Sequence, residues 1–599
     1  MKQYWDCSLC RIEDKGKALR CRRCYGQLRG RDRLLHEIGR QRKTAPRAAL
    51  LSALAAGAGQ MLGGRWSTGI ALAALIPLAV GLVIAGWGGF TYGHAFLAGG
   101  AGFVLAVAYL DARIGPQRKR PPCQETCPAG VAVPDYLQLL LDEEPQQGYS
   151  LIRSRIPMVG VIGRICPHPC ETACLRGIDG EPVSINGCKR HLADLQRERS
   201  RVHAEQRRSV VDLRGGELSV GVVGSGPAGV ACAYYLSVLG AAVTVYEADS
   251  VIGGRLATTI PDYRLPANIL DEELEALRDG GVVFNPNTRV GPGGVPLAEL
   301  RQDHDALFLA VGAEQAVSIA VPGGEGLRDF QELLRAAKLG HPVELGRSVV
   351  VIGGGNAAMD VSRTALRCGA EEVHLLYRRD RDQMPARADE VEEAAREGVQ
   401  FHFLADLAEV LTRDGAVCGV RVQQMELGAP DASGRPRPLA VRGQIRELPA
   451  DTVIPALGQE VGGSIFDDPA LAGLRRETYG GVWVDPVYQR TNLAGIYAGG
   501  DAVSGAATAV QAMAHGRRAA LGIFGDLAAA AVPASRLVDR LQRRPFRGHS
   551  ETPQARIREE MPRLTLRARR GSFREVEEGF QQEGACREGG RCLQCHREL

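Results

Sequence analysis

The sequence is poor in aromatic residues and carries almost no net charge. Phe, Trp and Tyr make up 5% of its 599 residues, whereas glycine occurs 74 times. This composition is typical of a nucleotide-binding α/β protein. The formal charge of +4 is small for a chain of this length, so charge does not indicate a nucleic-acid partner. On size alone we expect about four domains.

The sequence also lacks a recognisable secretory signal. Its first residues are polar and include cysteine, without the apolar run of a signal peptide. Most of the 16 cysteines fall in tight clusters, which indicates metal ligands in a reducing compartment and argues against disulfides. Cys232, Cys368 and Cys418 stand alone, and we expect them to be ordinary buried thiols.

The clearest motif begins at an apolar run, Val220–Val223, which predicts a buried parallel strand. Gly224, Gly226 and Gly229 follow in the spacing G-x-G-x-x-G, and a helical pattern and a second strand lead to Glu247. Such glycines allow a tight turn, close approach of a pyrophosphate and close helix–strand packing. The carboxylate of the acid would accept hydrogen bonds from a ribose diol. The alternative is a glycine-rich helix start without a ligand.

A second dinucleotide unit begins near residue 348. Its phosphate turn has alanine in the third position, and its second strand ends in two arginines in place of an acid. Guanidinium groups at this position would bind a 2′-phosphate, which favours NADPH over NADH. Two solvated surface arginines are the alternative. The predicted binding residues are Gly353, Gly355, Asn356, Ala358, Arg378 and Arg379.

The N-terminal region contains two CxxC pairs that are separated by ten residues and flanked by many arginines. Four thiolates in this spacing suit tetrahedral Zn²⁺ in a zinc ribbon, although iron would also fit four sulfurs. Four free thiols are the remaining alternative. The predicted ligands are Cys7, Cys10, Cys21 and Cys24.

The segment from 48 to 110 is almost uncharged, with Arg65 as the clear exception. Ile70–Phe90 and Ala95–Leu110 are predicted to cross a membrane, with Ala48–Leu62 re-entrant or interfacial. Basic clusters flank the segment on both sides, which places both flanks in the cytoplasm. We therefore expect a cytoplasmic-membrane protein whose soluble domains face the cytoplasm. A buried soluble hairpin is the alternative.

Two further cysteine groups, each beside proline, lie between 121 and 215. Short spacers and prolines that turn the thiolates inward suit iron–sulfur clusters, and a second zinc site is the alternative. The predicted ligands in this region are Cys123, Cys127, Cys166, Cys170 and Cys174.

The run from Gly163 to Cys174, followed by Pro182-Val183-x-Ile185, resembles the NADPH-oxidising small subunit of glutamate synthase. It is also similar to the N-terminal half of dihydropyrimidine dehydrogenase. The resemblance extends from about Pro122 to Leu527. It implies a helical domain with two [4Fe–4S] clusters, followed by an FAD domain and an NADPH domain.

The same resemblance implies further flavin contacts. Gly254, Arg255 and Leu256 follow the second flavin strand, in a loop that wraps the isoalloxazine in such enzymes. Gly500 and Asp501 precede a helix whose N-terminus would face the flavin, with the aspartate bound to the ribityl chain or pyrophosphate. A plain helix cap is the alternative for the aspartate.

The sequence departs from this family at two cluster positions. A CxxC pair expected just before Cys123 is absent, and Cys188-Lys189 stands where the family has a Gln or Glu ligand. Our hypothesis is that a C-terminal CxxC pair folds back to complete one cluster. That cluster would use Cys123, Cys174, Cys592 and Cys595, and the other would use Cys127, Cys166 and Cys170 with Cys188 as a candidate fourth ligand.

We therefore expect an α/β fold with two nested Rossmann-like dinucleotide-binding domains, an N-terminal α-helical iron–sulfur domain, and before these a transmembrane helical hairpin and a zinc ribbon. The predicted boundaries are 1–47 for the ribbon, 48–112 for the membrane segment, 113–215 for the cluster domain, 216–325 with 450–530 for the FAD domain, 326–449 for the inserted NADPH domain and 531–599 for a C-terminal tail.

The expected function is electron transfer from NADPH through FAD and two [4Fe–4S] clusters to a partner protein or a membrane acceptor such as quinone. Electron transfer in the reverse direction, to NADP⁺, is equally compatible with the sequence. A glutamate synthase small subunit with a separate glutamate-forming partner is a second hypothesis. A membrane-anchored redox sensor or scaffold is a third.

Overall fold

The computed structural model describes residues 120–178, 180–202, 218–430, 434–527 and 557–595. Contacts divide the chain into two units, and the helices and strands below all lie in the first, within 122–593. The predicted zinc ribbon and membrane crossings lie outside the described residues. Among the residues that are described, no helix combines the length and apolar character needed to span a bilayer.

The first described region is the helical domain. Its prolines start helices, because Pro134, Pro145 and Pro169 each occupy the first or second helical position, where proline loses no hydrogen bond. The helices are α5 (Pro122–Thr126), α6 (Val133–Leu141), α7 (Pro145–Arg153), α8 (Val159–Ile165), α9 (Pro169–Thr172) and α10 (Ile185–Val202), with a 3₁₀ turn, η1 (Leu175–Ile178).

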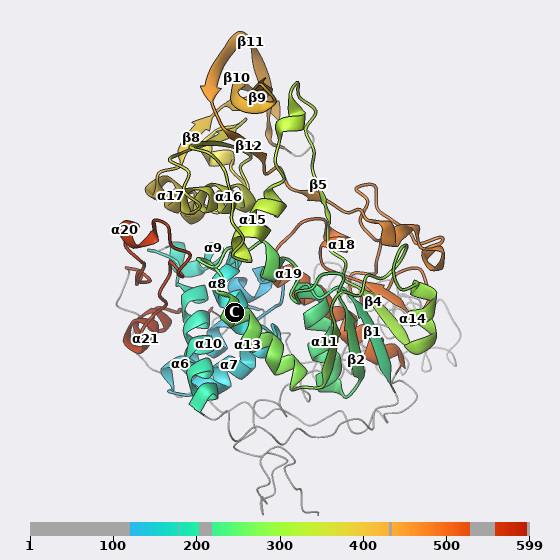
Figure 1. Ribbon diagram of the computed structural model, residues 1–599. Helices are drawn as coiled ribbons and strands as arrows, with labels where there is room; N and C mark the ends of the chain where they lie inside the picture. The colour runs from blue at the N-terminus through green and yellow to red at the C-terminus, as the bar shows by residue number, and fades with distance from the viewer. Residues whose placement is uncertain (1–119, 179, 203–217, 431–433, 528–556, 596–599) are drawn as a thin grey trace, which may run out of the picture. The chain divides into compact units, whose positions relative to one another are not determined.

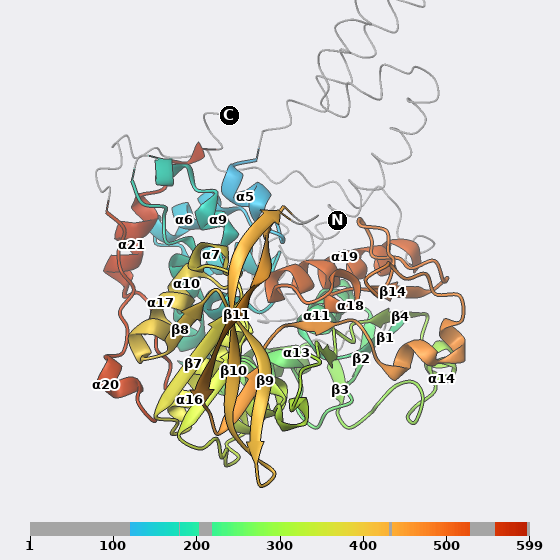
Figure 2. The same ribbon diagram turned by 90° about the horizontal axis from the view of Figure 1, so that it is seen from above.

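A five-stranded parallel sheet follows, in the order β14-β4-β1-β2-β3; Figure 1 labels β4, β1 and β2, and Figure 2 labels all five strands. Its strands are β1 (Ser219–Val223), β2 (Ala242–Tyr246), β3 (Val282–Asn285), β4 (Ala306–Leu309) and β14 (Ile496–Ala498). The associated helices are α11 (Pro227–Leu239), α12 (Arg255–Thr258), α13 (Ala267–Arg278), α14 (Leu297–Asp303), α18 (Asp501–Ser504) and α19 (Ala509–Leu527). Because β14 pairs with β4 from far along the chain, the residues between them form an insertion.

The insertion contains a second parallel sheet, in the order β12-β6-β7-β8. Its elements are β6 (Ser348–Ile352), β7 (Glu372–Tyr377), β8 (Gln400–Phe403) and β12 (Thr452–Pro455), with α15 (Phe330–Lys338), α16 (Asn356–Arg367) and α17 (Ala388–Glu397). β1 confirms the apolar run Val220–Val223 predicted as a buried strand, and β6 begins at residue 348, where the second unit was predicted to start.

The predicted domain boundary at 450 is wrong. We assigned the strand at 452 to the flavin domain, but β12 pairs in parallel with β6 of the inserted sheet. The inserted domain therefore extends through Pro455. The two connections between the domains then pair as a short antiparallel ribbon, β5 (Gln315–Ala316) with β13 (Gln459–Glu460).

A three-stranded antiparallel sheet completes the inserted domain (Figure 2). It consists of β9 (Ala405–Arg413), β10 (Ala416–Pro430) and β11 (Pro436–Pro449). Cys418 on β10 is exposed, because it lies in a part of this sheet that faces solvent. Our expectation of a buried thiol at this position is therefore wrong.

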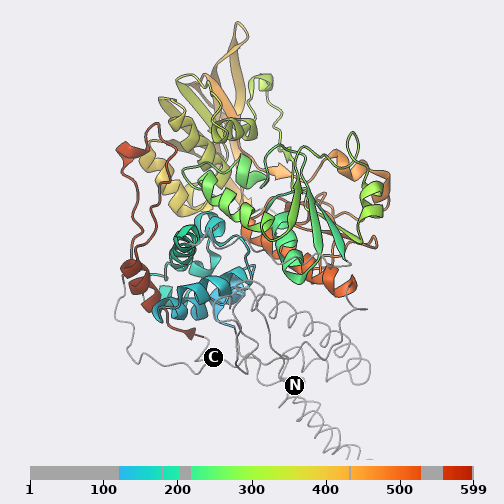
Figure 3. The same cartoon turned by 60° about the horizontal axis from the view of Figure 1, so that its bottom comes forward.

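The C-terminal segment from 557 to 593 packs on the helical domain (Figure 3). It contains α20 (Leu566–Arg569) and α21 (Gln582–Gly590), and α21 lies against α6 and α10. Glu588 is fully buried there, accepts hydrogen bonds from the amides of Ser184 and Glu559, and pairs with Arg591 at 2.6 Å. Unpaired, this carboxylate would be costly to bury.

Candidate functional site

The first phosphate turn joins β1 to α11. Gly224 has a φ of +99°, a left-handed conformation that favours glycine. A side chain on Gly229 would overlap the carbonyl oxygen of Gly224, so this glycine permits helix and strand to pack closely. At Gly226 a Cβ would meet no protein atom within 4 Å. The backbone at the start of α11 is therefore open on the side where a pyrophosphate would bind.

Glu247 lies at the end of β2, facing this turn. Its Oε2 accepts hydrogen bonds from the amide and hydroxyl of Ser225 at 2.9 and 2.5 Å, and its Oε1 accepts one from the amide of Asp249 at 2.9 Å. The carboxylate is half-buried and fixed in place. It can therefore accept hydrogen bonds from a ribose diol without first being ordered, as the sequence predicted for this position.

The loop that contains Gly254 closes on the same turn. The amide of Gly253 donates to the Ser225 hydroxyl at 2.9 Å, and a Cβ on Gly254 would lie 2.9 Å from the Cα of Gly226. Arg255 begins α12, donates to the carbonyl of Ala313, and has its pKa lowered by burial. Leu256 is buried beside it.

The structure brings Gly500 and Asp501 to this turn from the far end of the domain. Gly500 has a φ of +70°, and a Cβ there would lie 2.9 Å from the Cβ of Ala228 in α11. Burial raises the pKa of the Asp501 carboxyl, which accepts a hydrogen bond from the amide of Ala507 at 3.2 Å. Both residues therefore lie beside the start of α11, where the predicted flavin site is.

His515 belongs to this site, although the sequence offered no signal for it. Its Nδ1 accepts a hydrogen bond from the amide of Gly500 at 3.2 Å. Burial, together with Arg518, lowers the pKa of the His515 imidazole to about 4. A neutral ring that accepts this hydrogen bond holds the backbone of Gly500 and the start of α18 in position.

The second phosphate turn joins β6 to α16. Gly353 has a φ of +139°, and a Cβ there would overlap the carbonyl oxygen of Ala456. A Cβ on Gly355 would meet no protein atom within 4 Å, and Ala358 is fully buried where the helix packs. Asn356, the first residue of α16, accepts a hydrogen bond at Oδ1 from the amide of Arg387 at 3.0 Å.

The two arginines after β7 point in different directions. Arg378 is exposed, and its guanidinium is accessible to a ligand. Arg379 is buried, and its Nε donates to the carbonyl of Pro436 at 2.9 Å. Arg435, for which the sequence carries no signal, donates to the Tyr377 hydroxyl at 3.1 Å. From the bend just before β11, it therefore brings a second guanidinium to the end of β7.

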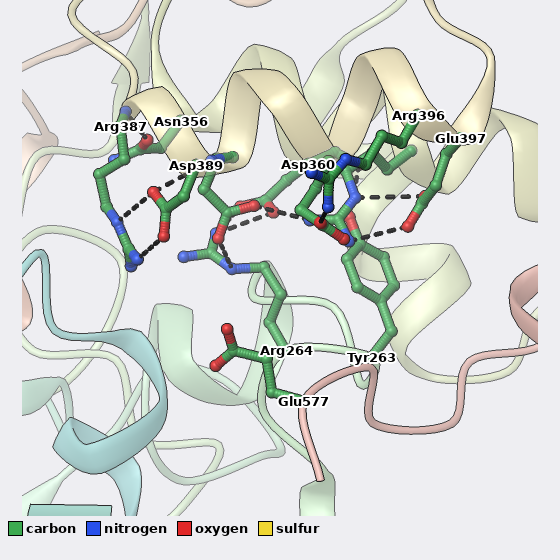
Figure 4. A network of polar contacts seen from close by, with 12 residues as sticks. Tyr263, Arg264, Asn356, Asp360, Arg387, Asp389, Arg396, Glu397 and Glu577 are labelled. Carbon is green, nitrogen blue, oxygen red and sulfur yellow. Dashed lines mark hydrogen bonds and ion pairs between the residues drawn. The ribbon is translucent and has the colours of Figure 1, made fainter. Parts of the chain in front are cut away.

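A buried network of arginines and acids ties the two nucleotide domains together (Figure 4). Arg264, from the flavin domain, donates to both carboxylate oxygens of Asp360 on α16, at 2.6 and 2.8 Å. Next to this pair, Arg363 and Arg367 of α16 bind Glu397 of α17. Burial alone would raise the pKa of Glu397, but hydrogen bonds from these two arginines hold it at about 2.

We expect Glu397→Gln to lower stability at neutral pH by about 3 kcal/mol, because the buried guanidinium groups of Arg363, Arg367 and Arg569 then lose a carboxylate partner. The pKa of this carboxyl falls from 4.5 to about 2 on folding. The ion pair therefore stabilises the fold above pH 4.5, and this stabilisation is lost as the pH falls towards 2. Thermal unfolding of both proteins at several pH values tests this.

Glu392→Gln is the matched control for that substitution. Glu392 lies on the same helix and pairs at 2.6 Å with Arg396, but both side chains are about half exposed. A surface pair of this kind contributes less than about 1 kcal/mol. Equal losses for the two variants would contradict a special contribution from Glu397.

The predicted cluster cysteines gather where α5, α8 and α9 meet. Cys166 ends α8, and a left-handed residue, His168, turns the chain so that Cys170 lies in the first turn of α9. Burial raises the pKa of the Cys170 thiol, Lys189 lowers it, and the thiols of Cys166 and Cys127 raise it further. The three thiols are therefore neighbours.

Among the described residues, no three His, Cys, Asp or Glu side chains surround a single metal ion. The thiolates of a four-iron cluster each bind a different iron atom and lie further apart than ligands of one ion. Tyr136 lies near three thiols in this region. Its hydroxyl donates to the carbonyl of Ile185 at 2.9 Å, and the thiols of Cys170, Cys188 and Cys123 help to raise its pKa, after burial as the main cause.

Cys592 follows α21, close enough to Cys188 to contribute to the raised pKa of that thiol, for which burial is the main cause. Cys595 belongs to the second unit of the chain. The predicted grouping of Cys123 and Cys174 with the C-terminal pair therefore stays a prediction.

Two family models match the chain. Residues 218–516 match pyridine nucleotide-disulphide oxidoreductase, and residues 106–201 match dihydropyrimidine dehydrogenase domain II, 4Fe-4S cluster. Among curated proteins, the NADP(+)-dependent formate dehydrogenase subunit beta of Moorella thermoacetica is 39% identical over 80% of this chain and 70% of its own length.

Two further relatives have comparable similarity. The NADPH-Fe(3+) oxidoreductase subunit beta of Geobacter sulfurreducens is 36% identical over 80% of this chain and 75% of its own length. The glutamate synthase [NADPH] small chain of Azospirillum brasilense is 36% identical over 69% of this chain and 89% of its own length.

Proposed function

Because the chain belongs to the family of NADPH-dependent FAD and iron–sulfur oxidoreductases that includes the glutamate synthase small subunit, we propose that it takes hydride from NADPH and passes single electrons to an acceptor outside the chain. The three relatives support an external acceptor. All three names include NADP or NADPH, but the second reactant or enzyme that they name differs: formate, Fe(3+) or glutamate synthase. Each protein is also called a subunit or a small chain.

The observation that carries the proposal is direct packing of the helical cluster domain on the helices of the flavin domain. Tyr235 of α11 donates to the carbonyl of Arg153 at 3.1 Å, and Arg517 of α19 donates to the carbonyl of Ser154 at 3.2 Å. Glu273 of α13 accepts hydrogen bonds from the amides of Gly160 and Val161 at 2.7 and 3.2 Å. These amides begin α8, which ends at Cys166.

When bound, FAD accepts two electrons as hydride and releases them singly, which nicotinamide alone does not do. The residues of the chain bind and orient the two nucleotides. Glycines at the two turns open helix N-termini to the phosphates, and Glu247 is fixed for a ribose diol. Arg264 and Asp360 hold the two nucleotide domains together.

The proposed preference for NADPH depends on Arg378. Arg378→Gln should lower kcat/KM for NADPH by about 100-fold, because the 2′-phosphate loses a charge-assisted contact. The value for NADH should change by less than about twofold, since NADH lacks this phosphate. Arg413→Gln, at an exposed arginine on β9, is the control, and equal losses with both nucleotides would contradict the assignment.

We also propose that Cys592 and Cys595 complete one [4Fe–4S] cluster with Cys123 and Cys174. The packing of α21 on α6 and α10, and the buried Glu588–Arg591 pair, support a fixed position for the segment before Cys592. The double variant Cys592→Ser and Cys595→Ser should lose about half of the bound iron and keep its FAD. Unchanged iron per FAD would contradict this.

The N-terminal zinc site and the two membrane crossings remain proposals from the sequence alone. If they are correct, the chain is held at the cytoplasmic face of the membrane, and quinone becomes a candidate acceptor together with a partner protein. Extraction of the protein from membranes by alkaline carbonate, without detergent, would argue against the crossings.

A glutamate synthase small subunit is the second candidate function, favoured by the similarity to the Azospirillum brasilense chain. In that case the acceptor is a separate glutamate-forming subunit. NADPH oxidation with an artificial one-electron acceptor tests the shared electron-transfer function. Glutamate formation after addition of a large subunit would select this candidate.

A further inference from the structure

The side chains of Cys188 and Lys189 lie on different faces of α10. Cys188 is completely buried, and its Sγ lies 3.7 Å from the carbonyl oxygen of Ala585 in α21. His191, almost one turn later, has Nδ1 at 2.9 Å from the carbonyl oxygen of Phe580 and Nε2 at 2.9 Å from Gln582 Oε1. This face of α10 is therefore covered by the C-terminal segment.

The other face of α10 lies against α8. Asn186 donates through Nδ2 to the carbonyl of Gly163 at 2.8 Å, and a Cβ on Gly163 would lie 2.9 Å from the Cα of Arg190. Residues three and four positions apart share a helix face, so Lys189 shares the face of Asn186. This face is directed towards the end of α8, where Cys166 lies.

Lys189 is a buried cation near the Cys170 thiol. Its side chain is 6% exposed, and its charge acts on the Cys170 thiol. Among the described residues, no carboxylate lies within 4 Å of its ammonium group. A buried cation without an acidic partner is costly. A thiolate-bound iron–sulfur cluster would supply the missing negative charge.

On the basis of the proposed function, we propose that the cluster held by Cys127, Cys166 and Cys170 has only three thiolate ligands, and that its fourth iron faces Lys189. Cys188, the candidate fourth ligand from the sequence, points towards α21 instead. An iron atom without a thiolate from the protein is the one most easily removed on oxidation.

The chemical consequence can be written as a balanced step. Ferricyanide takes one electron from the [4Fe–4S]²⁺ cluster and is reduced to ferrocyanide. The resulting [4Fe–4S]³⁺ cluster releases one Fe²⁺ ion and leaves [3Fe–4S]⁺, with all four sulfides and the three cysteine ligands retained. Added Fe²⁺ with one electron from dithionite restores the four-iron cluster.

The test uses the full-length protein, purified without oxygen, with iron, sulfide and FAD measured. Mild ferricyanide treatment of the wild type should produce the EPR signal of an oxidised three-iron cluster in about one cluster per chain. Enriched ⁵⁷Fe²⁺ added back under reducing conditions should enter a single iron site per chain, seen by Mössbauer spectroscopy. A wild type that keeps all its iron and shows no three-iron signal would overturn the proposal.

Two variants locate the labile iron. Lys189→Cys supplies a fourth thiolate and should reduce the three-iron signal at least about tenfold, whereas Cys188→Ser should form it as the wild type does. A full signal in Lys189→Cys, or loss of the four-iron cluster in Cys188→Ser with FAD and α-helical circular dichroism unchanged, would overturn the proposal. Protein without any iron or sulfide would instead contradict the proposed function.

Discussion

Gly226→Val should yield a folded protein that no longer retains FAD. The backbone at Gly226 has a φ of −64° and a ψ of 179°, a conformation that valine adopts readily. No protein atom lies within 4 Å of a Cβ at this position, so the fold tolerates the side chain. A bound pyrophosphate must approach the same open backbone, and the valine methyl groups would exclude it.

We expect the Kd for FAD to rise at least about 100-fold, which corresponds to ~2.7 kcal/mol. The measurement is the ratio of flavin to protein after gel filtration, followed by titration of the apoprotein with FAD. Thermal unfolding of the apoprotein should match that of wild-type apoprotein. Retention of stoichiometric FAD by this variant would show that the first turn does not bind the flavin.

Gly355→Val should abolish reduction by NADPH and leave the flavin in place. Gly355 occupies the equivalent position before α16, with an extended backbone and no protein atom within 4 Å of a Cβ. The substitution therefore blocks the second phosphate site alone. We expect kcat/KM for NADPH to fall at least about 100-fold, with reduction by dithionite unchanged.

The two glycine variants serve as controls for each other. Each removes one nucleotide and should spare the other, because the turns belong to different sheets. Calorimetric titration of the Gly226→Val apoprotein with NADP⁺ should give the wild-type affinity. If Gly355→Val lost its FAD, or Gly226→Val lost NADP⁺ binding, the assignment of one nucleotide to each turn would be wrong.

Local backbone requirements explain why the nucleotide turns could be predicted from the sequence. A left-handed φ at Gly224 and Gly353, and close helix packing at Gly229, depend on residues a few positions apart. The glycine spacing in the sequence and the backbone geometry that binds a phosphate therefore lie within one short segment. The acid at Glu247 follows from the same unit, because the second strand must end beside the turn.

Features that depend on distant segments could not be predicted in this way. β12 has the apolar character of any buried strand, and only its pairing with β6 assigns it to the inserted domain. Arg435, which precedes β11, reaches Tyr377 at the end of β7. For α10, the orientation of Cys188 and Lys189 depends on the helix phase and on α21, which comes from the far end of the chain.

The Arg–Glu network between the nucleotide domains is a further long-range feature. Arg264, Asp360 and Glu397 come from three helices or loops with no common sequence pattern. Arg264, the partner of Asp360, becomes apparent only when the two domains pack together.

Anaerobic titration of the full-length protein with NADPH tests the central claim most directly. If electrons pass from NADPH through FAD to two clusters, the flavin band and the broad cluster absorption should both decrease. About two NADPH per chain should be consumed, since FAD takes two electrons and each cluster takes one. Bleaching of both chromophores by dithionite but of neither by NADPH would contradict the account.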